Sequence, residues 1–470
     1  MNKKFCAVIL ILLFLITGCG QTSEVKDEKA NIEDKIHFTD DFGEEIILDK
    51  PAKRIISLYS AHTENLFSLG LDEEIIGVGK SDAFPPQVRT KEVFDYRSDP
   101  EKVINANPDL VLIRPFINRG NPEFVEALKK ANITVVSLYP EKFADFPKYI
   151  KKLAMLTGKE KEAEMLLAEF NNDLEEIKNK TSKIEPKVKV YFESTENEYR
   201  TITNDSMAAK AISLAGGINI ASDAKALREG TSIASYGVEK ILEKAEEIDV
   251  FVSQRGAMNS GGNEHSISIR PGFHAIKAVR EGRIYTIDEK FVSSPTFRFA
   301  KGVHELARMF YPELMDDLSC FADKESITRG DMAQIAVMYK HKGLFSPTSK
   351  YYKKKHEGHT YGDFADVAVD HPLFDYIETA CLAGYMEEDG KNFYPDKKIT
   401  RDELAQTLFM LTDLRDCPTT KNIKDLDKCT NQRIVQLVVD NGLLDLKANY
   451  FKPDDTVTGE EVVKALNNIK

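Results

Sequence analysis

The chain has 470 residues, which is about three domains at roughly 150 residues each, and its 42% hydrophobic and 30% charged residues exclude a disordered or many-span membrane protein. The formal net charge of −12 argues against nucleic acid as a partner, because nucleic-acid binders neutralise phosphates with a basic surface. Six cysteines are too few for a disulfide framework, and the absence of tryptophan removes the best aromatic platform for stacking bases or sugars.

The first element in chain order is an export signal. Lys3 and Lys4 precede the apolar run Ala7–Ile16, which has the length of a signal-peptide core and is too short to span a bilayer. The segment Leu15–Cys19 resembles the bacterial lipobox, in which the cysteine is lipidated and becomes the mature N-terminus. We therefore expect a signal peptide at 1–18, a lipid on Cys19 and a flexible tether at 19–35, and hence an extracytoplasmic protein anchored to the cell membrane. The alternative is an ordinary secretory signal that contains a cysteine.

Two groups of short β-branched runs then alternate with helical patterns. The expected strands are 54–57, 75–79, 109–113 and 134–138 in the first group and 188–193, 249–253 and 283–287 in the second. Each run is continuously apolar and bounded by Gly, Pro or Asp, as in parallel strands buried on both faces. Between the groups, apolar residues recur at helical spacing. The expected fold class is α/β, with two Rossmann-like lobes (36–145 and 184–315), a long backbone helix joining them (146–183) and a cleft between the lobes.

Several local motifs carry a resemblance to a known family. They are 54–58 with 63–70, 76–78, 101–103 with 107–111, 215–219 and 282–285. In this order and spacing they resemble the helical-backbone substrate-binding proteins of ABC importers, which serve vitamin B12, ferric siderophores and haem. The resemblance implies an ABC permease and its ATPase as partners and a small-molecule metal chelate as cargo. No G-x-S-x-G elbow, Walker loop or dinucleotide-binding glycine motif follows a strand, so we expect no enzyme activity and no cofactor.

Two acidic residues hold matching positions in the two lobes. Glu101 follows Asp99-Pro100 and opens a helix ahead of the strand at 109–113, and Glu239 opens a helix ahead of the strand at 249–253. Each matches the family's glutamate that meets an arginine of the membrane permease, a pairing that gives two bonds and a fixed orientation. The alternative is a carboxylate that only stabilises the helix dipole.

The resemblance also assigns a ligand cleft. Its positions are Tyr59, His62, Tyr96, Arg97 and Arg114 in the first lobe and Arg200, Arg255, Arg270, Phe297 and Arg298 in the second. Several arginines in one cleft favour an anionic ligand, and tyrosines add flat faces and hydroxyl groups. Ferric catecholate or carboxylate siderophores and the propionates of haem fit this chemistry. Corrinoids fit less well, because the B12-binding relatives rely on tryptophans that Tyr96 and Arg114 replace here.

A bare transition metal is a less favoured cargo. Related metal-binding proteins use three or four His, Asp or Glu ligands in the cleft. The lobes hold five histidines without an H-x-H or similar cluster: His37, His62, His265, His274 and His304. We therefore expect no metal site.

A motif recurs in the last part of the chain, residues 316–470. Two copies are 327–333 and 399–405, and 457–463 is a weaker third. A threonine before an acidic or polar turn and an apolar helix is an N-cap signal, so each copy is expected to begin a helix. Spacings of 72 and 58 residues predict a helical array in which neighbouring repeats bury each other's faces.

This region resembles the S-layer homology repeats that bind secondary polysaccharides of bacterial cell walls, often through pyruvylated sugars. The motif arginines Arg329 and Arg401 are the candidates for gripping a sugar carboxylate, whereas Gly459 takes that place in the third copy. The family's usual tryptophan is missing. The alternative is a tail that retains only the fold and serves as a spacer or a protein contact.

Three further expectations concern the same region. Cys417 and Cys429 are candidates for a disulfide outside the cell, and Cys381 lies in an apolar helix and is expected in the core. The basic run Lys350–Lys355 is expected to be a solvated loop.

Two functions remain open on the sequence alone. The first is a membrane-anchored receptor that captures a ferric siderophore-type chelate or haem, with a corrinoid as the other cargo, and delivers it to an ABC permease. The second is a structural or adhesion protein that is attached to the cell wall and whose lobes have lost their ligand. The presence of both Glu101 and Glu239 favours the first, because a protein that delivers no ligand has no physical need for the pair.

Overall fold

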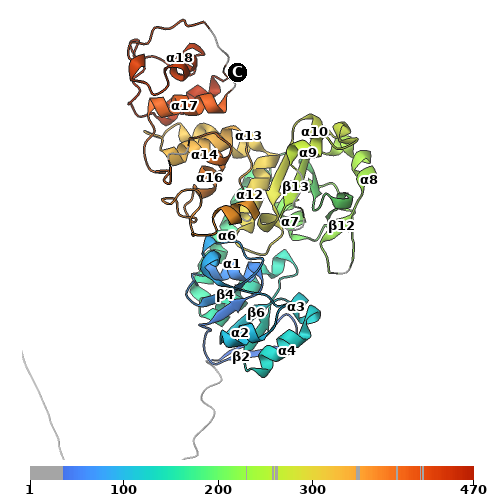
Figure 1. The fold of residues 1–470 in the computed structure, drawn as a ribbon. Helices are drawn as coiled ribbons and strands as arrows, with labels where there is room; N and C mark the ends of the chain where they lie inside the picture. The colour runs from blue at the N-terminus through green and yellow to red at the C-terminus, as the bar shows by residue number, and fades with distance from the viewer. Residues whose placement is uncertain are drawn as a thin grey trace, which may run out of the picture.

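The computed structural model describes residues 35–228, 230–256, 259, 263–345, 350–387, 390–412, 414 and 418–469. The expected signal peptide, Cys19 and almost all of the tether lie outside these residues, as does Cys417, so the lipid anchor stays a prediction. Cys429 has a free thiol in this structure, which does not show the expected Cys417–Cys429 disulfide. Within the described part, no helix combines the length and the apolar composition needed to cross a membrane. Figure 1 shows two α/β lobes and a third, mainly helical region.

The first lobe is built on a five-stranded parallel sheet in the order β5-β4-β3-β6-β7. The strands are β3 (Ile55–Ser57), β4 (Ile75–Gly79), β5 (Glu92–Phe94), β6 (Leu110–Ile113) and β7 (Thr134–Ser137). The helices are α1 (Ser60–Ser68), η1 (Pro86–Thr90), α2 (Glu101–Asn105), α3 (Pro115–Gly120) and α4 (Pro122–Lys130), and a hairpin of β1 (Ile36–Thr39) and β2 (Glu45–Leu48) precedes the sheet. The four expected strands are confirmed to within one residue, whereas edge strand β5 has two exposed residues and no apolar run to predict it from.

The second lobe repeats the plan with a parallel sheet in the order β10-β8-β13-β14. Its strands are β8 (Lys189–Glu193), β10 (Ile218–Asn219), β13 (Val250–Arg255) and β14 (Ile284–Asp288), and a small antiparallel sheet contains β9 (Thr201–Ile202), β11 (Lys225–Ala226) and β12 (Ile233–Ser235). The helices are α7 (Met207–Leu214), α8 (Val238–Glu243), α9 (Glu264–Ser268), α10 (Lys277–Arg280), α11 (Glu289–Val292), α12 (Phe299–Phe310) and α13 (Pro312–Met315). Its short 3-10 turns are η3 (Asn197–Tyr199), η4 (Ala245–Glu247) and η5 (Phe273–Ala275), whereas η2 (Phe143–Asp145) lies at the end of the first lobe. The three strands expected here are confirmed to within two residues.

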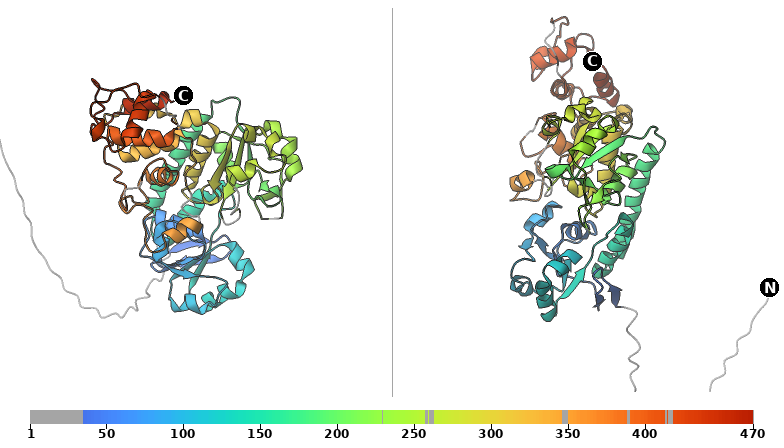
Figure 2. Two further views of the ribbon diagram at one scale, coloured as in Figure 1. Left: turned by 45° about the horizontal axis from the view of Figure 1, so that its top comes forward. Right: turned by 90° about the vertical axis from the view of Figure 1, so that its right-hand side faces the viewer.

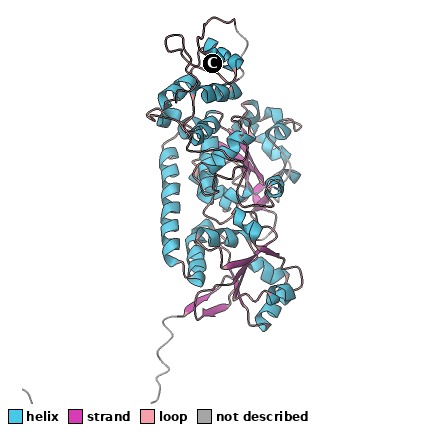
Figure 3. Cartoon of the chain, turned by 60° about the vertical axis from the view of Figure 1, so that its left-hand side comes forward, coloured by secondary structure: helices cyan, strands magenta, loops and turns pink. Residues whose placement is uncertain are grey.

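Two helices in series join the lobes. The first, α5 (Phe146–Thr157), ends at Gly158, whose φ of 68° lies in the left-handed region, and α6 (Glu160–Thr181) follows. This corrects the expectation of one unbroken helix over 146–183, because a left-handed glycine closes a helix at its C-terminus. The 22 residues of α6 span about 33 Å. It packs against α5 and against α7 and α12 of the second lobe, and Figures 2 and 3 show it running along one side of the molecule.

The third region contains three helices that begin at the recurring motif. They are α14 (Arg329–Tyr339), α17 (Arg401–Leu411) and α19 (Gly459–Asn467), each capped by the hydroxyl of the expected threonine. The other elements are η6 (Leu318–Phe321), α15 (Lys350–Lys355), α16 (Phe374–Leu382), η7 (Leu426–Lys428) and α18 (Gln432–Asp440). Cys381 lies in α16 and is buried, as expected.

The three repeats close into a ring. The ring is formed by backbone hydrogen bonds among the residues that precede the three capping threonines, Ile327, Ile399 and Val457. The N–H of Ile327 donates to the carbonyl of Val457 over 3.1 Å. The N–H of Val457 donates to the carbonyl of Ile399 over 3.3 Å, and the N–H of Ile399 donates to the carbonyl of Ile327 over 3.0 Å. These three side chains are at most 1% exposed. The predicted mutual burial of neighbouring repeats is therefore confirmed, and it extends from the third repeat back to the first.

The motif arginines link one repeat to the next. Arg329 donates from Nε to the carbonyl of Phe393 over 2.8 Å and lies 3.5 Å from Glu403. Arg401 is fully buried, donates to the carbonyls of Phe451 and Asp445 over 2.7 Å each and forms an ion pair with Glu461. In this structure the guanidinium of Arg401 is thus closed off from a sugar carboxylate, which corrects its expected role in wall binding.

The glycine of the third copy has a packing reason. A Cβ at Gly459 would lie 1.7 Å from the carbonyl oxygen of Phe321, so no other residue fits without moving the backbone. Its N–H donates to the carbonyl of Lys324 of the first repeat over 2.8 Å. The departure from the arginine pattern therefore marks the place where the ring closes.

The basic run Lys350–Lys355 forms helix α15, not the expected loop. Tyr352, inside this run, is 3% exposed, and His356 just after it is 2% exposed. The run was misjudged because its lysines suggested a solvated segment, whereas two aromatic side chains hold it against the rest of the protein.

Candidate functional site

The lobes touch each other through α1 of the first lobe and the segment 290–298 of the second. Glu64 receives two bonds from Arg298, from Nε over 2.6 Å and from an Nη over 2.7 Å, with both side chains largely buried. The amide of Asn65 donates to the carbonyl of Pro295 over 2.9 Å. Arg298, expected to contact a ligand, therefore links the lobes.

A cavity of about 1000 Å³ lies between the lobes, beside this contact. It is lined from the first lobe by residues that follow β6 and β7, among them Arg114 and Tyr139, and from the second lobe by residues around β12, among them Arg228. In the first lobe these residues lie at the carboxyl ends of parallel strands, where ligands bind in open α/β sheets, whereas the second lobe contributes its small antiparallel sheet. Its volume suits a ligand of drug or cofactor size.

Positive charge predominates on the cavity wall. The lining contains six basic residues, Arg114, Arg119, Lys142, Lys148, Lys152 and Arg228, against four acidic ones, Asp41, Glu141, Asp145 and Asp205. Lys152 is already paired with Asp41 over 2.6 Å. The remaining surplus attracts an anionic ligand, and it acts in a partly enclosed space where water screens charge poorly.

Arg114 stands out among these residues because its guanidinium lies against aromatic rings. Its central carbon is 4.9 Å from the ring centre of Tyr59 and 5.0 Å from that of Phe116. Tyr59 also lies 6.1 Å from Tyr139, and burial raises the pKa of the Tyr59 hydroxyl. Within the described residues, Arg114 forms no ion pair with a carboxylate, so its charge remains available to a ligand.

His62 lies inside the first lobe rather than at the cavity. It is 0% exposed, its Nε2 donates to the carbonyl of Ile113 over 3.0 Å, and its Nδ1 accepts from the hydroxyl of Tyr149 over 2.7 Å. Both ring nitrogens are satisfied by the protein, and burial lowers the pKa of His62 to about 4. The structure thus gives His62 a role in packing.

Acid is expected to destabilise the lobes through this histidine. Its folded-state pKa of about 4 lies below the usual 6.5, so the stability that it contributes is complete above pH 6.5 and is lost as the pH falls towards 4. The loss over this window is about 3 kcal/mol at most. Urea denaturation at pH 7 and pH 4 should show a smaller pH dependence for His62→Gln than for the parent chain. Equal dependence in both proteins would contradict this role of His62.

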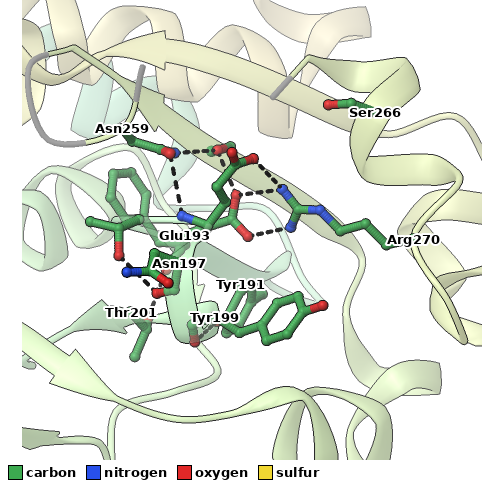
Figure 4. Close-up of polar contacts among 12 residues, drawn as sticks. Tyr191, Glu193, Asn197, Tyr199, Thr201, Asn259, Ser266 and Arg270 are labelled. Carbon is green, nitrogen blue, oxygen red and sulfur yellow. Dashed lines mark hydrogen bonds and ion pairs between the residues drawn. The ribbon is translucent and has the colours of Figure 1, made fainter. Parts of the chain in front are cut away.

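Two of the arginines expected from the second lobe are held by nearby carboxylates. Arg270 makes bonds of 2.5 and 3.2 Å to Glu193, which is 0% exposed, and a further bond of 3.1 Å to Glu196 (Figure 4). Arg200 pairs with Glu198 over 2.7 Å. Arg270 and Arg200 are thus neutralised within the second lobe, which the sequence alone did not indicate.

The remaining expected residues are spread over several places. Phe297 packs between Phe146 and Phe170, at ring distances of 5.4 and 5.9 Å, and Arg255 is half-buried at the end of β13. Arg97 is exposed and lies over the ring of Tyr96 at 4.7 Å. Of the ten predicted ligand residues, Arg114 is the one that lines the cavity among the described residues.

Sequence reasoning missed most of the residues that line the cavity. Tyr139 follows the predicted strand 134–138 just as Arg114 follows 109–113, and this position could have indicated it. Lys142 and Lys148 lie at the start of the connecting helices, where lysine is ordinary on a surface. Arg228 belongs to the small antiparallel sheet region, which no periodic pattern predicts.

Glu101 and Glu239 occupy equivalent exposed places in the two lobes. Glu101 is in the first turn of α2, ahead of β6, and Glu239 is in the first turn of α8, ahead of β13. Figure 1 shows α2 in the first lobe and α8 at the outer side of the second. Neither carboxylate forms an ion pair within the described part of the chain, so both are available to a partner.

Two parallel α/β lobes, a helical connection and a cavity between the lobes define a two-lobed solute-binding protein. The model of the family described as periplasmic binding protein matches residues 55–291, and the chain belongs to this family. The model of the S-layer homology domain matches residues 363–405.

Individual relatives match the lobes. The uncharacterized ABC transporter substrate-binding lipoprotein YvrC of Bacillus subtilis is 27% identical over 315 residues, covering 65% of this chain and 96% of its own. A vitamin B12-binding protein of Vibrio campbellii is 25% identical over 272 residues, covering 57% of this chain and 93% of its own. A periplasmic solute binding protein from Veillonella parvula has a solved structure with a TM-score of 0.50 and 21% identity, covering 67% of this chain and 95% of that one, and it shows the fold alone.

Proposed function

We propose that the protein is the solute receptor of an ABC importer and that it captures an anionic iron chelate, a ferric siderophore or haem. The observation that carries this proposal is the cavity of about 1000 Å³, with its surplus of basic side chains and the Arg114 guanidinium lying against Tyr59. Carboxylates and catecholates bind guanidinium groups through charge-assisted bonds, and aromatic faces pack against a flat ligand. The lobes bind this ligand without changing it chemically, so the protein is not an enzyme.

A corrinoid is the second candidate ligand. It is favoured by the likeness to a protein named as vitamin B12-binding. The chain contains no tryptophan, however, and the cavity's excess of basic groups favours a ligand with negative charge.

Delivery would occur outside the cytoplasm, at the membrane. Glu101 and Glu239 would each meet a basic residue of the permease, one per lobe, and the partner ATPase would drive transport. Lipidation of Cys19 would hold the protein at the bilayer, consistent with the YvrC relative being named a lipoprotein. The repeat region would add attachment to cell-wall polysaccharide, which the S-layer homology match supports.

Removal of the Arg114 charge is expected to weaken ligand binding. Arg114→Ala should lower the affinity for a ferric catecholate or for haemin about tenfold to hundredfold, because a charge-assisted hydrogen bond contributes about 1.5–3 kcal/mol. Arg97→Ala is the matched control, since it removes the same charge from an exposed site outside the cavity. The visible absorption of the bound chelate measures the affinity. Equal losses in the two variants would argue against this cavity as the site.

A further inference from the structure

The two intervals between the repeat motifs differ in length. Thr328 and Thr400 are 72 residues apart and Thr400 and Thr458 are 58 apart, so the first interval is longer by 14 residues. The longer interval contains α15 and the loop that follows it, which we call the arm, residues 350–363. The left view of Figure 2 shows the orange helix α15 beside the blue first lobe.

The arm is fixed to α16 of the repeat region by buried polar contacts. The hydroxyl of Tyr352 donates to Glu378 of α16 over 3.1 Å, and the N–H of Asp363 donates to the other oxygen of Glu378 over 2.7 Å. His356 lies 3.1 Å from Asp363, which also pairs with Lys355. Glu378 is 0% exposed, so the arm is packed against the repeat region through a buried carboxylate.

The arm also contacts the first lobe, through the side chain of Arg89 in η1. One Nη of Arg89 donates to the carbonyls of His356 and His359 over 3.0 and 2.9 Å, and the guanidinium lies 5.9 Å from the ring centre of Tyr352. Backbone carbonyls accept these bonds, so the contact requires the arm's particular backbone shape rather than opposite charge. The guanidinium is half-buried, and this burial lowers the pKa of Arg89.

The repeat region is bound to the second lobe as well. Lys301 of α12 forms an ion pair with Asp375 of α16, and the N–H of Leu344 donates to Glu305 of α12 over 3.1 Å. The repeats therefore contact both lobes at once. They form a third connection between the lobes, in addition to the α5–α6 helices and the Glu64–Arg298 pair.

We infer that the repeat region is a brace that sets the angle between the lobes and restrains opening of the cavity. Relative movement of the lobes must break either the Arg89 contact with the arm or the α12 contact with α16. Both contacts are needed for this restraint, because the repeat region, which has its own closed core, transmits force between the lobes only while it is attached to each of them. Forces on the repeats, such as attachment to a wall polymer, would then act on the cavity. This inference goes beyond the proposed function and does not depend on which ligand the cavity holds.

Hydrogen–deuterium exchange of the full mature chain tests the brace. In Arg89→Gln, we expect backbone exchange to rise at least threefold in two places: in the arm, and in the inter-lobe contact at residues 59–66 and 290–298. The matched control is Arg54→Gln, since Arg54 also donates to two backbone carbonyls, of Ala106 and Asn107 over 2.7 and 2.9 Å, but within the first lobe. The control should leave both places unchanged.

A second variant approaches the brace from the other lobe. Asp375→Asn removes the ion pair with Lys301 and should also speed exchange at the inter-lobe contact, whether or not Arg89→Gln folds well enough to be measured. Faster exchange confined to the arm or to α16, with the inter-lobe contact unchanged in both variants, would overturn the inference. So would an equal effect of Arg54→Gln at the inter-lobe contact.

Discussion

Charge reversal at Glu101 and Glu239 is expected to abolish uptake of the chelate while leaving its binding affinity unchanged. Both carboxylates are exposed, lie in the first turn of matching helices and form no ion pair within the described residues, so the lobes do not need them to fold. If the proposed docking holds, a lysine at each place would face a basic residue of the permease and repel it. Loss of one partner of a charged interface pair costs about 2–5 kcal/mol, so the double variant should reduce uptake by more than a hundredfold.

The uptake of radiolabelled iron chelate into cells that express the importer measures this effect. Glu123→Lys with Glu281→Lys is the matched control, because it makes the same charge change at one exposed site on each lobe. Normal uptake by the Glu101 and Glu239 double variant would contradict the docking assignment. A loss of affinity in that variant would instead place the two glutamates in the ligand site.

Substitution of Arg401 is expected to unfold the ring of repeats. Arg401→Leu would leave the carbonyls of Phe451 and Asp445 and the carboxylate of Glu461 without their partner. Breaking a buried pair costs about 3–5 kcal/mol, and the partial exposure of Glu461, at 22%, places the expected loss near the lower end, about 3 kcal/mol. In the full chain, the backbone amides of α17 and α19 should lose their protection from hydrogen–deuterium exchange. The variant should also no longer co-sediment with cell walls that carry secondary polysaccharide.

Lys464→Leu provides the comparison for that variant. It removes a cation that pairs with Asp445 at the surface, where the side chains are 62% and 72% exposed. Such a pair adds little to stability, so protection of α17 and α19 should be unchanged. Wall binding that survives unfolding of the repeats would contradict their proposed role in attachment.

Local patterns in the sequence predicted the elements of this fold well. Strands and helix starts depend mainly on residues close together in the chain, which can be read directly from the sequence. This applies to the continuous apolar runs of β3, β4, β6, β7 and β8 and to the threonines that cap α14, α17 and α19. The break at Gly158 was missed because the apolar spacing continues on both sides of it.

The site was harder to predict because its chemistry depends on partners distant in the chain. Arg298 and Arg270 have the residue type that a ligand cleft favours, yet Glu64 and Glu193 bind them. Arg401 matches a sugar-binding position by motif, but ring closure buries it. Arg114, which the resemblance assigned to the cleft, lines the cavity because it directly follows a strand, whose carboxyl end fixes its place, and its contact with a ligand stays a prediction.

Equilibrium titration of the wild-type mature protein with three purified compounds tests the central claim most directly. The compounds are a ferric tricatecholate, haemin and cyanocobalamin, and visible absorption reports binding of each. The proposal predicts saturable binding at one site per chain for at least one of the two anionic chelates, with a dissociation constant near or below about 1 μM, and weaker binding of the corrinoid. Failure of both anionic chelates to bind, or tighter binding of cyanocobalamin than of either, would contradict it.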